Sequence, residues 1–330
     1  MAEIDLNPQF VRALDLMENS QDSLFITGRA GTGKSTLLSY FKKNTSQNIV
    51  ILAPTGVAAV NIGGATIHSF FKFKSDVTME KAWVLGGKAK KPDLYKSLDA
   101  IVIDEISMVR ADLLDCVDAF MRRVCGTMAP FGGKRVIFFG DLYQLPPVVT
   151  RDDREIFTSR YDSAFFFSAD VISRTPITFV ELDHIYRQND EEFIAVLNAI
   201  RENTATEADL ALLNTRVHEE YAPPPEEYVI HLTGTNRDAE SYNTYQLHSL
   251  EGETKSFQAT STGAFDRRTE PAPRELVLKI GAQVMLTSND REKRFINGTV
   301  GRVEDISWEN GTPIVSIRLT SGNLVEVGPN

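Results

Sequence analysis

The sequence predicts an α/β protein in which helices cover a parallel sheet. Two observations lead to this class. Short apolar runs alternate with segments of helical periodicity up to about residue 140. A glycine-rich turn follows the first apolar run, and polar side chains directly follow two later runs. Strands that alternate with helices favour a parallel sheet buried on both faces.

The expected elements follow one another in a regular order. Strands are predicted at 23–27, 48–53, 100–103 and 135–139. Helices are predicted after the first strand, at 34–43, and after the third strand, at about 109–124. In the second of these helices, apolar residues such as Val117, Phe120 and Val124 recur at helical spacing.

A second α/β unit is expected to begin near Thr178. An amphipathic helix is predicted at 190–201, and Thr206 with Asp209 forms a capping box for the next helix. A strand is expected at 228–232, and Asn236 is expected to cap the helix after it. No periodicity holds from Glu251 to Glu275, which indicates a long loop.

After Leu276 the pattern becomes that of a β protein. Strands are predicted at 283–287, 299–305, 313–319 and 324–327. Asn310-Gly311 and Ser321-Gly322 have the composition of hairpin turns between them. These short strands predict a small barrel.

Composition sets limits on function. The 330 residues include only two cysteines, without metal or redox spacing, which favours an intracellular setting, cytoplasm or nucleoid, or the nucleus in a eukaryote. No apolar run is long enough to cross a membrane, and no signal-peptide pattern is present. The net charge of -10 weighs against a nucleic-acid partner. However, seven lysines between Lys72 and Lys96 could form a local DNA contact or an ordinary solvated loop.

One motif indicates a nucleotide site. Residues Gly28–Ser35 read GRAGTGKS and match the pattern G-x-x-x-x-G-K-[ST] in full. The glycines allow backbone N–H groups to surround a phosphate, Lys34 reaches the β- and γ-phosphates, and the Ser35 hydroxyl suits Mg²⁺. A predicted strand precedes the motif and a predicted helix follows it, which is the context that such a loop requires.

Two carboxylates follow a later strand. The segment AIVIDEIS, 100–107, places Asp104 and Glu105 directly after a buried run. Burial of an unpaired carboxylate is expensive, so Asp104 is expected to act through the Mg²⁺ shell. Glu105 would then polarise the attacking water. The alternative is an acidic strand end that is simply exposed to solvent.

A third polar segment lies at the same edge of the expected sheet. FFGDLYQLPPV, 138–148, ends a strand on polar residues and continues into two prolines that stiffen the chain. In a parallel sheet the carboxyl ends of the strands face the ligand, and Gly28, Asp104 and Asp141 all lie at such ends. Gln144 could therefore contact the γ-phosphate or its attacking water. The alternative is a rigid loop without a function.

The motifs resemble a known family. GRAGTGKS, APTGVAAVNIGGATIHSFF, IVIDEISMV, PFGGKRVIFFGDLYQLPPV, ELDHIYRQ and LTGTNRDAESYN occur in this order. Together they resemble the Pif (petite integration frequency) helicases, which are relatives of RecD in superfamily 1B, from about Pro8 to Val303. The stretch 112–133 resembles the signature that separates the Pif group from RecD.

This resemblance implies an activity and a domain organisation. It implies DNA-dependent ATP hydrolysis with ATP and Mg²⁺ as cofactors, and 5′→3′ movement on single-stranded DNA. The partners implied are single-stranded DNA and forked or 5′-tailed duplexes, and no obligatory protein partner is evident. The domains implied are a RecA-like domain at 1–177 with an insertion at about 70–96, the first part of a second RecA-like domain at 178–275, and part of an SH3-like insertion at 276–330. The family's QG-type segment and late LSR-type arginine do not occur, so we expect the second domain to be incomplete here.

The resemblance also assigns the nucleotide site. The implied ATP-binding residues are Gln9, Gly31, Thr32, Gly33, Lys34, Ser35, Thr36, Asp104, Gln144 and Arg187. The implied catalytic residues are Lys34, Glu105, Gln144 and Arg187, and the implied Mg²⁺ ligands are Ser35 and Asp104. Gln9 resembles the glutamine that reads adenine, and Arg187 resembles the arginine that reaches the γ-phosphate from the second domain. Their alternatives are a polar residue on an N-terminal helix and a surface ion pair.

A second set of residues is implied to bind DNA. These residues are Thr55, Gly56, Val57, His68, Ser69 and Phe70 in the first domain and Thr235 and Asn236 in the second. Hydroxyls, amides and helix N-termini suit phosphate contacts. Phe70, Phe71 and Phe73 could stack on bases, but core packing is the more usual role of such side chains.

Two other functions are compatible with part of the pattern. A P-loop kinase or metabolic NTPase that does not act on nucleic acid would explain the first two motifs but not Arg187, Gln144 or the Thr-Gly and His-Ser segments. A non-catalytic strand-binding module would leave Lys34 and Glu105 without a role. DNA-stimulated ATP turnover separates the three possibilities.

Overall fold

The computed structural model describes most of the chain and divides it into two compact units. The described residues are 7–149, 157, 159–184, 191–218, 221, 223–224, 227–259, 273–288, 290, 292 and 294–329. The first unit is Met1–Val217 and the second is His218–Asn330.

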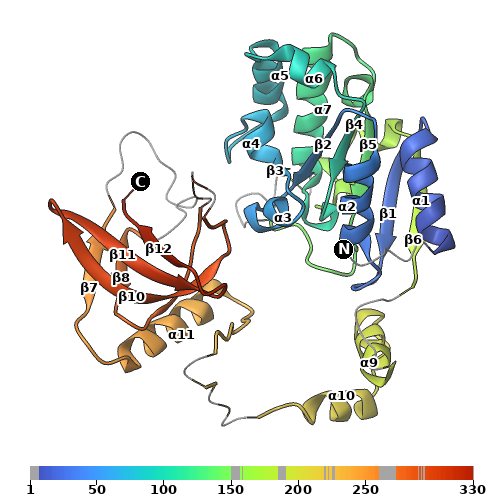
Figure 1. The fold of residues 1–330 in the computed structure, drawn as a ribbon. Helices are drawn as coiled ribbons and strands as arrows, with labels where there is room; N and C mark the ends of the chain where they lie inside the picture. Colours follow the sequence, from blue (N-terminus) through green and yellow to red (C-terminus); the bar gives the residue numbers. More distant parts are fainter. Residues whose placement is uncertain are drawn as a thin grey trace. The chain divides into compact units, whose positions relative to one another are not determined.

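The first unit contains a six-stranded sheet in which neighbouring strands are all parallel (Figure 1). The strand order is β3-β2-β4-β5-β1-β6. The strands are β1 (Ser23–Gly28), β2 (Ile49–Ala53), β3 (Ala65–Thr66), β4 (Ala100–Ile103), β5 (Arg135–Phe139) and β6 (Ile177–Leu182). The sheet confirms the α/β fold class and the four predicted strands.

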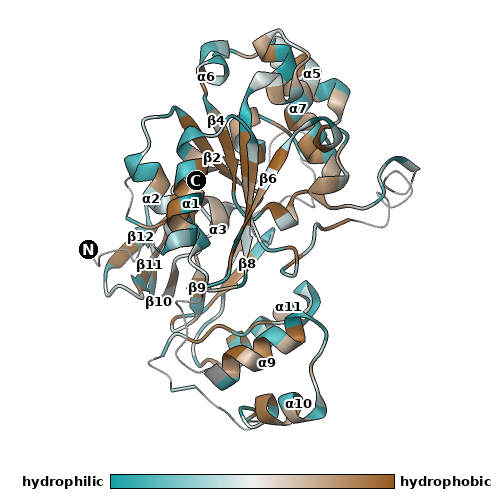
Figure 2. Ribbon diagram, turned by 90° about the vertical axis from the view of Figure 1, so that its right-hand side faces the viewer, coloured by the Kyte–Doolittle hydropathy of each residue, from teal (hydrophilic) through white to brown (hydrophobic). Residues whose placement is uncertain are grey.

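Helices cover both faces of this sheet. Successive residues of a strand point to opposite sides, and here both sides are apolar, so both faces must be buried. Leu24, Ile26 and Phe139 pack in a cluster with α1 (Pro8–Asn19) and α2 (Lys34–Asn44). Phe25, Ile103 and Phe138 pack in a second cluster with α7 (Ala111–Cys125). In Figure 2 the central strands β2 and β4 are coloured as hydrophobic, as expected for strands buried on both faces.

Further helices and turns complete the first unit. These are α3 (Gly56–Asn61), α4 (Ile67–Phe71), α5 (Met79–Gly87), α6 (Pro92–Lys96), α9 (Glu191–Arg201) and α10 (Glu207–Asn214), with 3₁₀ turns η1 (Ile106–Met108), η2 (Pro130–Gly133), η3 (Phe166–Ser168) and η4 (Ile172–Arg174). The predicted capping box is present at the start of α10, where Thr206 and Asp209 bond each other's backbone N–H. Among the described residues, no helix is long and apolar enough to cross a bilayer.

The first sheet continues past the boundary expected at residue 178. Strand β6 pairs in parallel with β1 along its whole length, from Ser23 opposite Ile177 to Gly28 opposite Leu182. It is therefore the edge strand of the first sheet, and the division between units comes after Val217. The sequence could not show this because an edge strand and the first strand of a new unit have the same local pattern.

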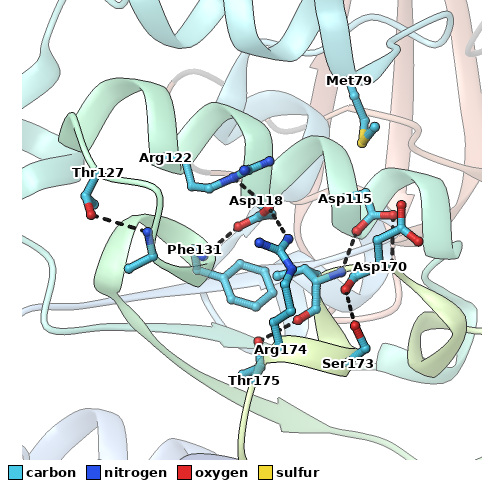
Figure 3. A network of polar contacts seen from close by, with 12 residues as sticks. Met79, Asp115, Asp118, Arg122, Thr127, Phe131, Asp170, Ser173, Arg174 and Thr175 are labelled. Carbon is cyan, nitrogen blue, oxygen red and sulfur yellow. Dashed lines mark hydrogen bonds and ion pairs between the residues drawn. The ribbon is translucent and has the colours of Figure 1, made fainter.

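Two buried aspartates on α7 fix the segments around this helix (Figure 3). The Asp115 carboxylate accepts hydrogen bonds from the backbone N–H groups of Asp170 and Val171, at 3.1 and 2.9 Å, and from the Tyr161 hydroxyl at 2.9 Å. The Asp118 carboxylate accepts the Phe131 N–H at 2.7 Å. These aspartates lie in the stretch 112–133, which resembles the Pif signature and which forms most of α7 and all of η2.

Replacing Asp118 with alanine should destabilise the first unit. The Asp118 side chain is 2% exposed and also pairs with Arg122 at 2.9 Å and Arg174 at 3.4 Å. Loss of one member of a buried charge pair leaves the others unsatisfied, so we expect a loss of about 3 kcal/mol in the free energy of unfolding. Urea unfolding followed by Trp83 fluorescence in a Trp308→Phe background measures it. Asp170→Ala, which removes an exposed pair with Arg160, is the matched control and should have a much smaller effect.

The second unit is a small β structure with one helix. Its four-stranded antiparallel sheet has the order β12-β11-β10-β9. Its elements are α11 (Asn236–Ser249), β7 (Lys255–Gln258), β8 (Glu275–Leu278), β9 (Gln283–Met285), β10 (Val300–Glu309), β11 (Thr312–Leu319) and β12 (Leu324–Val327). Asn310 and Gly311 both have positive φ, at 50° and 81°, as the predicted hairpin turn requires. This sheet is compatible with the predicted SH3-like insertion.

Three local predictions in this unit are wrong. Residues 228–232 do not form a strand. The cap of α11 is Thr235, whose hydroxyl accepts the Asp238 N–H, and Asn236 is the first residue of the helix. The segment 251–275 is not a continuous loop, because β7 pairs with β8 in an antiparallel two-stranded sheet. Residues 260–272 lie outside the described part of the chain.

Candidate nucleotide and nucleic-acid sites

Three neighbouring strands bring the polar segments of the sequence together. Strands β4, β5 and β1 are adjacent in the sheet, and all three are parallel. Their carboxyl ends lead into Asp104-Glu105, into the segment from Asp141 to Gln144, and into the loop 28–35. The shared edge that the sequence predicts is therefore present.

The loop after β1 has the backbone that a phosphate requires. Gly31 and Gly33 have φ of 83° and 84°, which residues with a side chain rarely adopt. A Cβ on Gly28 would lie 2.4 Å from the Leu182 carbonyl oxygen and 2.7 Å from Thr32 Oγ1. Helix α2 begins after Gly33 without a side-chain cap, so its first N–H groups face the loop. Ser35 and Thr36 are exposed at this helix end.

The side chains of the loop differ in what they contact. Thr32 is fully buried and its hydroxyl donates to the Arg29 carbonyl at 2.9 Å. The Thr32 backbone N–H also bonds to the Arg29 carbonyl, at 3.3 Å. Lys34 Nζ donates to the carbonyls of Gly28 and Arg29, at 2.6 and 3.1 Å, so it lies across its own loop. Burial lowers the pKa of Lys34, while the nearby carboxylates, Asp141 foremost, act in the opposite direction.

Asp104 and Glu105 lie directly after β4, with different exposure. Asp104 is 6% exposed, and burial raises its pKa to about 6. Its Oδ1 accepts the Glu105 N–H at 2.9 Å. Glu105 has φ 51° and ψ 43°, the left-handed conformation, which is uncommon for a residue with a long side chain. Such strained positions are concentrated at functional sites.

The donor set of this edge fits Mg²⁺. A carboxylate whose pKa is raised by burial gains from a cation, and the Ser35 hydroxyl, in the first turn of α2 after the β1 loop, is a candidate second oxygen ligand. Asp104 and Ser35 are thus the residues that would hold the ion.

The affinity of the protein for Mg·ATP should fall as the pH drops through about 6. Protons compete with the ion for Asp104, so each further pH unit should cost up to about tenfold. The fold itself should not be lost for this reason. A raised pKa means that the protonated Asp104 contributes stability below the unfolded-state value of 3.8, and this contribution is lost as the pH rises through about 6.

Titration with a fluorescent ATP analogue and Mg²⁺ between pH 5 and 7.5 measures this effect. The terminal phosphate of a nucleotide also titrates near pH ~6. Asp104→Asn is therefore the control, and it should show only the nucleotide's own pH dependence. Equal slopes in the two proteins would contradict the prediction.

Asp141 and Gln144 form the third part of the site. Gly140 lets this chain end approach η1, since a Cβ there would lie 2.9 Å from Ile106 Cγ2. The Asp141 carboxylate is buried and accepts the Tyr143 N–H at 3.1 Å and Gln144 Nε2 at 3.4 Å. Gln144 is exposed, so its side chain is accessible from solvent.

The residues described at the three strand ends do not include the remaining two ATP-binding candidates, Gln9 and Arg187. Gln9 lies on α1, and its Oε1 accepts the Asp183 N–H, just after β6, at 3.1 Å. Its side chain thus ties α1 to the sheet and remains a proposal as an adenine contact. Arg187 lies outside the described residues, so its place is also a proposal.

The DNA candidates of the first unit lie at the starts of two short helices. Thr55 caps α3, where its hydroxyl accepts the Ala58 N–H at 3.3 Å, and Gly56 begins this helix. Val57, 47% exposed, and Ser69, also exposed, face solvent. His68 is half-buried, and burial lowers its pKa.

The phenylalanines of this region are mainly core residues. Phe71 and Phe73 are buried and their rings stack with centroids 5.4 Å apart. Phe70 is half-buried and packs edge-on against Phe71 and Tyr95. Only Phe70 therefore keeps an exposed part that could contact a base.

The DNA candidates of the second unit lie at the start of α11. Thr235 is the exposed N-cap, and Asn236 is exposed beside it. The Thr235 hydroxyl also donates to Asp238 Oδ2 at 2.7 Å. A phosphate at this helix end would have to compete with that carboxylate.

The sequence reasoning missed two residues at the nucleotide site. Arg201, at the end of α9, pairs with Asp141 at 3.0 Å, and Glu202 pairs with Arg29 of the loop at 2.8 Å. A basic residue in the last turn of a helix is common because it complements the helix dipole, so Arg201 gave no distinctive signal.

Comparison with known proteins identifies the family. The sequence profile of the PIF1-like helicases matches residues 10–210. The chain is 33% identical to the ATP-dependent DNA helicase Pif1 of Bdellovibrio bacteriovorus, over 98% of this chain and 72% of that protein. It resembles a structure of Pif1 helicases at forked double-stranded DNA, with 35% identity and a TM-score of 0.81. This match covers 98% of this chain and 76% of that one. It also resembles the crystal structure of Bacteroides Pif1 in complex with ADP-AlF3 and single-stranded DNA, with 33% identity and a TM-score of 0.80. This match covers 98% of this chain and 74% of that one.

The match covers most of this chain but only part of several relatives. The chain spans 34% of the PIF1 helicase of Saccharomyces cerevisiae and 46% of that of Mus musculus. The resemblance noted in the sequence is confirmed. The chain belongs to the PIF1-like helicases, a family of ATP-dependent DNA helicases.

Proposed function

We propose that this chain hydrolyses ATP at the edge formed by β4, β5 and β1 and couples hydrolysis to 5′→3′ movement on single-stranded DNA. The observation that carries the proposal is the convergence of Lys34, Asp104, Glu105 and Gln144 on adjacent strand ends. Related proteins have been crystallised with single-stranded DNA and with ADP-AlF3, which supports both halves of the proposal.

Each residue has one role in this scheme. The loop N–H groups and Lys34 hold the phosphates, and Glu105 orients and deprotonates the attacking water. Gln144 contacts the γ-phosphate or that water. Ser35 and Asp104 would hold Mg²⁺, which would supply neutralisation of the charge on the phosphates. Arg187, on the segment that follows β6, stabilises the charge that develops at the γ-phosphate, a contribution of about 10³–10⁵ in related transfers.

The coupling proposal involves both units of the chain. ATP binding would favour one state of the chain and hydrolysis another, because a ligand shifts the equilibrium toward the state that it binds more tightly. The two DNA sets, at Thr55–Val57 with His68–Phe70 and at Thr235–Asn236, would then hold the strand alternately. We propose residues 218–259 as part of the second RecA-like domain and the β9–β12 sheet as part of the SH3-like insertion.

Oligo-dT should stimulate ATP turnover by about 5- to 150-fold, the usual size of coupling between sites. The groups proposed for DNA suit phosphates and stacking, so sequence should matter little. Log affinity should fall with log salt, at a slope of about -0.7 per phosphate contacted. The measurements are steady-state turnover and fluorescence anisotropy at several salt concentrations.

Blunt duplex DNA of equal length and the Lys34→Met variant are the controls. An ATP turnover rate that does not change with oligo-dT but rises with a small phosphate acceptor would support the kinase alternative instead. Binding without turnover would support the strand-binding module.

A further inference from the structure

The end of α9 reaches both sides of the nucleotide site. Arg201 contacts Asp141, after β5, and the next residue, Glu202, contacts Arg29, after β1. Asn203, with φ 56°, ends the helix, and the Thr204 N–H bonds back to the Ala199 carbonyl at 2.8 Å. Two consecutive residues at this helix end thus contact the segments that follow two different strands.

Arg201 is held far more tightly than a surface arginine. Its side chain is 17% exposed and that of Asp141 is 2% exposed. The guanidinium carbon lies 4.1 Å from the centre of the Tyr143 ring, and Arg201 Nε is buried without a hydrogen-bond partner among the described residues. A buried donor left unpaired is unfavourable, so the stacked, ion-paired position must be favoured by its other contacts.

Asp141 connects Arg201 to the proposed γ-phosphate contact. The same carboxylate accepts Arg201, the Tyr143 N–H and, at the long distance of 3.4 Å, Gln144 Nε2. A carboxylate only accepts hydrogen bonds, so its orientation follows its strongest donor, the charged guanidinium. The charge of Arg201 thus fixes the Asp141 carboxylate, and its flat guanidinium group fixes the Tyr143 ring by stacking on it. Asp141 and Tyr143 are separated in the sequence only by Leu142.

We propose that Arg201 is a positioning residue for ATP hydrolysis, which acts through Asp141 and Tyr143 to hold Gln144 toward the nucleotide. The proposal rests on the proposed function, because it explains how one of its residues is aimed. It also assigns α9 to the nucleotide site, where Glu202 and Arg29 tie the same helix end to the phosphate loop.

Steady-state turnover at saturating oligo-dT tests the catalytic part. Arg201→Met should lower kcat by about 10- to 100-fold, the usual effect of losing a residue that orients a reacting group. KM for ATP should change less than about threefold, because Arg201 does not contact the loop that holds the phosphates. Arg201→Lys keeps the charge but loses the flat stacking surface, so it should recover part of kcat.

Arg160→Met is the matched control. Arg160 also pairs with an aspartate, Asp170 at 3.1 Å, and lies 5.5 Å from the ring centre of Tyr161, but on the α7 side of the unit. An equal loss of kcat in both variants would mean a general effect on the fold and would overturn the proposal. The proposal would also be overturned if the losses of kcat in Arg201→Met and Gln144→Ala were fully additive in the double variant, because the two residues should act as one unit.

Amide hydrogen exchange gives a test that needs no turnover. The Tyr143 N–H bonds to the Asp141 carboxylate at 3.1 Å, and the Gln144 N–H bonds to the Asp141 backbone carbonyl at 3.0 Å. Arg201→Met should therefore make the Tyr143 N–H, and with it the turn that contains the Gln144 N–H, exchange faster in the nucleotide-free protein than Arg160→Met does. Unchanged exchange together with a lower kcat would place Arg201 on the nucleotide itself and overturn the positioning role. If the unaltered chain shows no DNA-stimulated turnover, the proposed function fails, whereas the exchange result still decides on Arg201.

Discussion

Replacing Glu105 with glutamine should reduce ATP turnover by about 10²–10⁴-fold, the usual contribution of a positioned general base, while ATP binding is retained. Glutamine has the same shape as glutamate but cannot accept the proton of the attacking water. The backbone of Glu105 is fixed independently of its carboxylate, by its left-handed conformation, by its N–H bond to Asp104 and by the Met108 N–H that its carbonyl accepts at 3.0 Å. The substitution should therefore leave the local structure unchanged.

Single-turnover hydrolysis and titration with a fluorescent ATP analogue measure the two effects separately. Glu80→Gln is the control, because Glu80 is an exposed glutamate in the first turn of α5. Turnover at the parental rate in Glu105→Gln would show that another group activates the water. Loss of nucleotide binding in the same variant would show that Glu105 belongs to the phosphate or Mg²⁺ site.

Replacing Lys34 with methionine should abolish measurable turnover, a loss of about 10³-fold or more. Methionine keeps the unbranched apolar stem but removes the cation that the transferred phosphoryl group requires. Lys34 Nζ lies between two loop carbonyls and within reach of the charges of Asp141, Glu105 and Asp104. Among the described residues, no neighbouring lysine of the loop can replace it.

Lys42→Met is a closely matched control. Lys42 lies on the same helix, and its Nζ also donates to two backbone carbonyls, those of Ile62 and Gly63, at 3.1 and 2.7 Å. It is remote from the loop, so turnover should remain near the parental value. If Lys34→Met retained DNA-stimulated turnover, the loop 28–35 would not be the site of hydrolysis.

The sequence by itself determined the fold class, the four central strands of the first sheet and the family. These features depend on local properties. A buried parallel strand is a continuous apolar run, and a phosphate loop needs glycines at fixed spacing because only they adopt positive φ without strain. The rule that ligands meet the carboxyl ends of parallel strands then placed Gly28, Asp104 and Asp141 at one edge, where the structure has them.

Only the tertiary structure decided which strand completes the first sheet, what the phenylalanines pack against and how Glu105 and Asp141 are held. β6 joins β1 through backbone hydrogen bonds that carry no sequence signal, and Phe71 is buried because α7 covers it. The contact between Arg201 and Asp141 joins residues 60 positions apart. Local patterns report on backbone preference and burial, whereas such contacts depend on where the chain returns after many residues, which packing of the whole unit sets.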